Sequence, residues 1–161
     1  MKTTHINLIL LSFVILCFNA CQDIQAIAEL ESLKAQKVLE EQNKSVVQRY
    51  WDGKWNERRP EVLDELLTED IINHGGTDDI HGIEEYRQVY GTYLSAMENT
   101  RFEIKELIAE GDRVMSRCFF YGTYNGTLGD IYPVGEELSF KFITVFRLVD
   151  GKIAEEWELF Q

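Results

Sequence analysis

Basic residues and proline are both scarce in this sequence. Of 161 residues, 16 are Lys or Arg against 28 Asp or Glu, and two are Pro, so the formal net charge is −12. Because a protein that binds phosphates needs a basic face, this charge argues against nucleic acid and anionic lipid headgroups as partners. The low Pro content, with 45% hydrophobic residues, argues against a disordered or fibrous chain. We expect one globular domain with a modest extension, and partners that are small, neutral or apolar remain open.

Cysteine is scarce as well, with Cys17, Cys21 and Cys118 in the whole chain. The first two lie in or beside an N-terminal apolar run, which leaves Cys118 without a partner for an internal disulfide. Phe119 and Phe120 follow Cys118 and favour a buried strand, where a lone Cys is usually a small apolar filler.

Long hydrophobic runs are rare too, and the one that stands out is Ile6–Phe18. As a helix it would be about 20 Å long, which is short for a hydrocarbon core of about 30 Å. Lys2 precedes the run, and this order is typical of an export signal. The run is followed by Ala20-Cys21, which resembles the lipobox of bacterial lipoprotein signal peptides.

This resemblance implies that residues 1–20 are a signal peptide and that Cys21 is acylated after their removal. Acyl chains at Cys21 would attach the protein to a membrane of the bacterial cell envelope. The alternative is an ordinary secretory signal cut near Ala20, which would give a secreted or periplasmic protein with a free thiol at Cys21.

Residues 21–42 contain no Gly or Pro and are rich in Ala, Leu, Glu, Lys and Gln, which are good helix formers. We expect a helical tether here, or alternatively an extra first helix packed on the domain that follows.

Residues 43–161 carry the pattern of a folded domain. Apolar residues first recur at helical spacing in three segments, and from Phe102 onward they alternate in four strands. Asp150-Gly151 is a strong hairpin signal between the last two strands. Three helices followed by an antiparallel four-strand meander indicate an α+β fold, with the helices packed on one face of a curved sheet.

Several strings of this domain resemble the SnoaL-like polyketide cyclase family of the nuclear transport factor 2-like superfamily. They are NKSVVQRYWDGKWN, the segment VLDELLTEDIINH that closes on Asn73-His74, the glycine-containing stretch 111–140 and the closing hairpin FRLVDGKIAEEWE. The resemblance implies a cone-shaped α+β barrel, also called cystatin-like, with a pocket between sheet and helices. It also implies a reaction that uses no metal and no organic cofactor.

The resemblance further assigns a general acid or base for aldol ring closure to the last strand, where DGKI aligns it with Glu158. A histidine that assists this acid is replaced by Thr144, and Glu156 stands where the wider group often has a histidine. Strand periodicity puts Glu156 and Glu158 on one face. Burial and like charge would raise one carboxyl pKa toward neutrality, which suits a proton shuttle. Alternatively, both are solvated charges or pair with Arg117 or Lys141.

Other residues are weaker candidates for substrate binding. His74 would lie near the pocket mouth in this family geometry, although a lone histidine in a turn is more often structural. Arg117 would position an anionic or carbonyl oxygen, or neutralise a glutamate. The aromatic residues Trp51, Tyr90 and Phe142 would form the pocket wall. The spacing of the histidines lacks an i, i+4 pair or a Cys cluster, so no metal site is expected.

The sequence therefore predicts a lipid-anchored domain that binds a small apolar carbonyl compound and catalyses proton transfer in an aldol cyclisation or isomerisation. Two alternatives stay open: a non-catalytic ligand-binding module of the same fold, and a domain that mainly forms a homodimer through its open sheet face.

Overall fold

The computed structural model describes residues 2–160, with side chains placed for residues 24–159. It divides into two compact units, Met1–Val38 and Leu39–Gln161. The first unit is part of helix α1 (Lys2–Trp51), and its side chains at Ile24 and Leu33 are exposed. The predicted tether is thus helical throughout. Cys21 and the predicted signal peptide lie outside the residues whose side chains are described. Among the described residues, no helix is both long and apolar enough to cross a membrane.

The end of α1 begins the domain and continues into a π-helical turn, η1 (Asp52–Asn56). Val47, Tyr50 and Trp51 are buried at helical spacing, which places one apolar stripe against the core. The short helix α2 (Val62–Leu66) packs on η1 so closely that a β-carbon at Gly53 would lie 2.6 Å from Cγ2 of Val62. Glycine at this position therefore permits the contact. Helix α3 (Ile83–Ala96) follows Gly82.

Within residues 2–160 the strands form one six-stranded sheet in the order β2-β1-β6-β5-β4-β3. Their bounds are β1 Leu67–Asn73, β2 Ile80–His81, β3 Met97–Glu110, β4 Arg113–Tyr124, β5 Glu137–Val149 and β6 Lys152–Phe160. The last four form the predicted antiparallel meander. The first strand adds to it in parallel with β6. The predicted α+β class, with helices on a curved sheet, is therefore confirmed.

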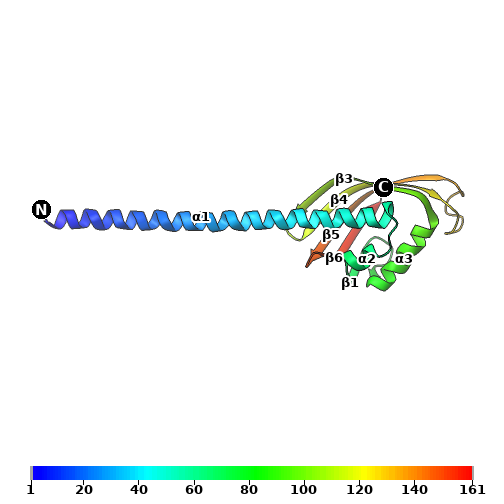
Figure 1. Ribbon diagram of the computed structural model, residues 1–161, viewed down its shortest axis with the longest axis horizontal. Helices are drawn as coiled ribbons and strands as arrows, with labels where there is room; N and C mark the ends of the chain where they lie inside the picture. The colour runs from blue at the N-terminus through cyan, green and yellow to red at the C-terminus, as the bar shows by residue number, and fades with distance from the viewer. Residues whose placement is uncertain (1, 161) are drawn as a thin grey trace. The chain divides into compact units, whose positions relative to one another are not determined.

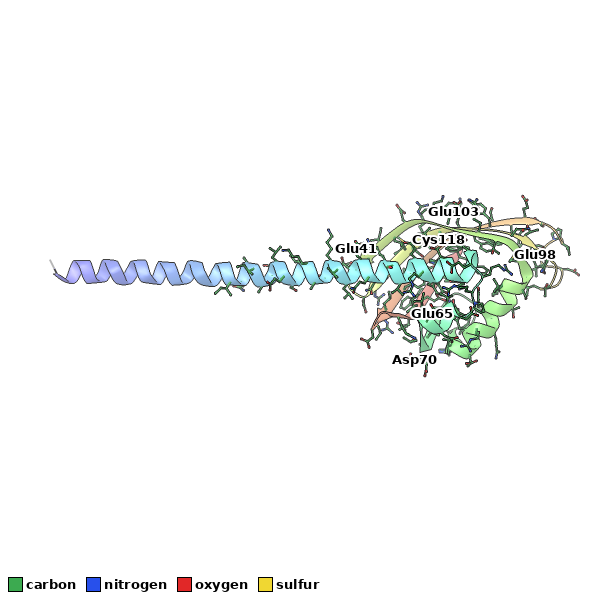
Figure 2. The ribbon with its side chains drawn as sticks, in the orientation of Figure 1. Glu41, Glu65, Asp70, Glu98, Glu103 and Cys118 are labelled. Carbon is green, nitrogen blue, oxygen red and sulfur yellow. The ribbon has the colours of Figure 1, made fainter. Side chains whose placement is uncertain are left out.

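The sheet has an inner face toward the helices and an outer face. Figure 1 shows α2 and α3 on the same side of the curved strands β3 and β4. Along β4 burial alternates strictly, so Cys118 faces inward and is fully buried, whereas Glu103 of β3 lies on the outer side (Figure 2). Cys118 is the free cysteine among the described side chains, as predicted, and burial raises the pKa of its thiol to about 11.

Candidate active site

A cavity of about 320 Å³ opens between the helices and the inner face of the sheet. Its wall is mostly aromatic and aliphatic. Polar side chains among its lining residues include Lys54 from η1, Asn73 from the end of β1, and Glu158 from β6. An apolar cavity with a few convergent polar groups is the usual form of a small-molecule site.

Glu158 brings a carboxyl group to the cavity wall. Burial, together with the negative charge of Glu156, raises its pKa to about 7, although the charge of Lys54 acts in the opposite direction. A β-carbon at Gly75 would lie only 3.0 Å from Oε2 of Glu158, so glycine at this position makes room for the carboxyl group. At neutral pH, Glu158 is thus present in both its acid and its base form.

Glu156 points the same way as Glu158, as strand periodicity predicts, but it is fully buried behind the cavity wall. The Nδ2 of Asn73 donates to its Oε1, and the hydroxyl of Tyr50 donates to its Oε2 over 3.2 Å. The Oδ1 of Asn73 accepts from the backbone N–H of Gly75 at 2.9 Å. The parallel register of β1 and β6 pairs Asn73 with Glu156 and so creates this contact.

Lys54 is a buried cation, with 6% of its surface exposed. Its Nζ donates to the hydroxyl oxygens of Tyr50 at 2.7 Å and Tyr86 at 2.6 Å. Five aromatic rings lie around the same ammonium group, from 4.9 to 5.8 Å between Nζ and the ring centroids. Tyr90, one of the five, donates its hydroxyl to the backbone carbonyl of Lys54. These contacts hold the lysine in place from three elements.

The tyrosines of this cluster are neutral hydrogen-bond donors at physiological pH. Burial, and next the charge of Glu156, raises the pKa values of Tyr50 and Tyr86 well above their usual range. Burial likewise raises the pKa of Tyr90 to about 12. Tyr50 and Tyr86 also share a hydrogen bond with each other, so Lys54, two phenols and Glu156 form one connected network.

Several residues singled out in the sequence do meet at the cavity. Trp51, Tyr90 and Phe142 line it together with Glu158. Thr144 lies opposite Glu158 in the register of β5 and β6 and is fully buried. Its Oγ1 has no hydrogen-bond partner among the described residues.

The structure places His74 and Arg117 away from the cavity. Arg117 lies on the outer face, where its Nε donates to Oε2 of Glu106 at 2.7 Å. The ring of His74 stacks on Trp157, with 5.2 Å between centroids, and its Nδ1 lies 2.9 Å from Oδ2 of Asp79. Neither side chain is therefore in position to bind a substrate in this cavity, and Arg117 pairs with neither candidate acid.

Lys54 and Asn73 are the site residues that sequence analysis missed as functional candidates. A signal for Lys54 exists, because it follows Tyr50 by four residues and lies in a stripe that is otherwise aromatic. No comparable signal identifies Asn73 as the partner of Glu156, because that contact depends on strand order. Within the part of the chain that the structure describes, no group of three or more His, Cys, Asp or Glu residues could hold a metal ion.

Fold and site together define a class: an α+β domain with an apolar cavity, one carboxyl group on its wall and a buried Lys-Tyr-Glu network beside it. The sequence agrees, because residues 45–161 match the family model for SnoaL-like polyketide cyclases. The chain belongs to the SnoaL-like polyketide cyclase family. A comparison with curated proteins finds no significant match.

Solved structures share the fold at low sequence identity. A provisionally named SnoaL-like polyketide cyclase from Jannaschia sp. CCS1 has a TM-score of 0.69 and 22% identity, covering 76% of this chain and 87% of that one. AclR from Streptomyces galilaeus, provisionally named a hydroxylase, has a TM-score of 0.67 and 20% identity, covering 76% of this chain and 90% of that one. An LEH-like epoxide hydrolase from M. tuberculosis has a TM-score of 0.62 and 16% identity, covering 76% of this chain and 84% of that one. These similarities show the fold, and the reaction has to be inferred from the residues of the site.

Proposed function

We propose that this domain binds a small, largely apolar carbonyl compound and moves a proton at the carbon next to the carbonyl group. The observation that carries the proposal is that the carboxyl group of Glu158 lies on the wall of an apolar cavity. The pKa of this carboxyl group is about 7, which matches the pH at which it would work. A general acid or base is most effective when its pKa lies near the operating pH.

The chemistry begins when the Glu158 carboxylate accepts a proton from the α-carbon of the bound compound. The electron pair of the broken C–H bond moves toward the carbonyl oxygen and forms an enolate. In an isomerisation, Glu158 returns the proton to a different carbon. In an aldol cyclisation, the enolate carbon instead bonds to a second carbonyl carbon, and Glu158 gives its proton to the new alkoxide.

Glu156 is a positioning residue in this scheme rather than a catalytic one, because it lies behind the cavity wall. Its negative charge is one cause of the raised pKa of Glu158. Hydrogen bonds from Asn73 and Tyr50 hold it in place.

The test uses 2-tetralone, an apolar bicyclic ketone, in D₂O at pD 7. The wild-type protein should incorporate deuterium at the α-carbon faster than buffer does, as measured by mass spectrometry. Glu158→Gln keeps the shape of the side chain but cannot accept the proton, so we expect the excess rate to fall at least about 100-fold.

The matched control is Glu155→Gln, on the outer face of the same strand, which should exchange at the wild-type rate. An unchanged rate in Glu158→Gln would contradict the proposal. Binding of 2-tetralone by the wild type without any exchange above buffer would instead support the alternative of a non-catalytic receptor.

We also propose that the mature protein is attached to the bacterial cell envelope through acyl chains at Cys21. The support is the sequence alone, namely the apolar run Ile6–Phe18 followed by Ala20-Cys21. More than one acyl chain is needed for stable anchoring, since a single myristoyl-length chain binds only marginally.

A further inference from the structure

Lys54 is the group in this site that the proposed proton transfer does not use. It is more than nine-tenths buried, and it belongs to the residues that line the cavity. The π-helical turn η1 presents it there, since Gly53 and Lys54 are the buried residues of that turn. Such turns within helices often occur at functional sites.

The hydrogen bonds of Lys54 are incomplete. An ammonium group has three N–H donors. Two of them have acceptors, the hydroxyl oxygens of Tyr50 and Tyr86. Among the side chains described at residues 24–159, there is no acceptor for the third donor and no carboxylate in an ion pair with Lys54. The aromatic rings around the ammonium group offset part of the cost of burying it, but they leave its third N–H without a hydrogen-bond acceptor.

No negatively charged group among the described side chains contacts the ammonium group of Lys54 directly. Lys54 is a buried cation, Glu156 is a fully buried acid nearby, and Glu158 is a half-buried acid on the cavity wall. The remaining groups that face this region, Tyr50 and Tyr86, are neutral phenols. When Glu158 is protonated, one positive charge is balanced only by Glu156, which reaches Lys54 through the tyrosine hydroxyls rather than directly.

We propose that the third N–H of Lys54 binds an oxygen of the ligand that carries negative charge, so that the ligand is an apolar body with one anionic oxygen. In the first case, the carboxylate case, the oxygen belongs to a carboxylate group that the ligand already carries. In the second case, the enolate case, it is the enolate oxygen that forms when Glu158 takes a proton from the ligand. The second case rests on the proposed function, whereas the first requires only that the ligand occupies the same cavity.

Two probes of similar shape separate charge from size: 2-naphthoate, which is an anion, and 2-naphthamide, which is neutral. At pH 6 we expect the full-length protein to bind 2-naphthoate at least about 10-fold more tightly by titration calorimetry, because a charge-assisted hydrogen bond is stronger than a neutral one. Lys54→Met should weaken 2-naphthoate binding at least about 10-fold and change 2-naphthamide binding less than about 3-fold.

The matched control is Lys105→Met, because Lys105 lies in β3 and pairs with Glu103 outside the cavity. It should bind both probes like the wild type. Wild-type affinity for 2-naphthoate in Lys54→Met, or a wild-type preference for 2-naphthamide, would rule out the carboxylate case.

A measurement on the wild type covers the case in which Lys54→Met fails to fold. With ¹³C-labelled lysine, the NMR signal of Cε in Lys54 should shift more on saturation with 2-naphthoate than on saturation with 2-naphthamide. An unmoved signal with 2-naphthoate would rule out the carboxylate case, and the inference as a whole is overturned if the enolate case below fails as well.

The enolate case has its own measurement, the deuterium exchange of 2-tetralone in Lys54→Met. If the exchange rate falls about as far as in Glu158→Gln, the result supports binding of the enolate oxygen by Lys54 during the reaction. An unchanged exchange rate rules out the enolate case.

The two proposals fail separately. If 2-naphthoate binds through Lys54 and no exchange occurs, only the proton-transfer proposal is wrong. If exchange depends on Glu158 and 2-naphthoate does not bind, a resident carboxylate on the ligand is ruled out.

Discussion

At the scale of single residues, Glu158 couples the site to the stability of the fold. Its pKa is raised to about 7 in the folded protein, mainly by burial and then by the charge of Glu156, whereas an unfolded chain has a Glu pKa of about 4.3. The folded state therefore binds the proton more tightly. Its contribution to the free energy of unfolding is fully present below pH 4 and is lost as the pH rises through 7.

We therefore predict that Glu158→Gln, which stays neutral at every pH, gains stability relative to the wild type as the pH rises. Between pH 4 and pH 8 the difference in the free energy of unfolding should move toward the variant by at most about 4 kcal/mol, at about 1.4 kcal/mol per pKa unit. Urea denaturation of both proteins at the two pH values measures it. A constant difference would mean that Glu158 titrates normally.

At the scale of elements, the turn η1 depends on the glycine at its centre. A β-carbon at Gly53 would approach the side chain of Val62 to 2.6 Å, and Val62 is fully buried in α2. We predict that Gly53→Ala lowers the free energy of unfolding by about 1–3 kcal/mol, the usual cost of overpacking. Because η1 also carries Lys54, binding of 2-naphthoate should weaken in the same variant.

Gly91 in α3 provides the comparison for Gly53. No atom lies within 4 Å of a β-carbon placed there. Ala is the better helix former by roughly 1 kcal/mol, so Gly91→Ala should stabilise the domain in the same denaturation experiment. Equal effects of the two substitutions would show that contact with Val62 does not control η1.

At the scale of the whole molecule, the outstanding expectation is the lipid anchor. Cells that express the full chain should incorporate a radioactive fatty acid into the wild-type protein and not into Cys21→Ala. Cys118→Ala is the control, because Cys118 is buried and its thiol pKa is raised, so it should label like the wild type. Label in both wild type and Cys21→Ala would remove the lipoprotein proposal.

Much of the site's layout could be derived from alternation, a local property of the chain. The sequence places Glu156 and Glu158 on one face of β6, and both face inward. The same rule, applied to the apolar neighbours Cys118 and Phe120, puts Arg117 on the outer face, where it lies. His74 follows the buried Asn73 and points elsewhere for the same reason.

By itself, the sequence determined the α+β class, the antiparallel meander and the placement of the two acids on one face of the last strand, because hydrophobic periodicity reflects which side of a helix or strand a residue lies on. Only the tertiary structure decided what those acids meet. Asn73 reaches Glu156 because β1 pairs in parallel with β6, and Lys54 reaches the cavity because η1 turns it inward between three tyrosines. Contacts between residues far apart in sequence depend on strand order and helix packing, and no local period encodes either of them.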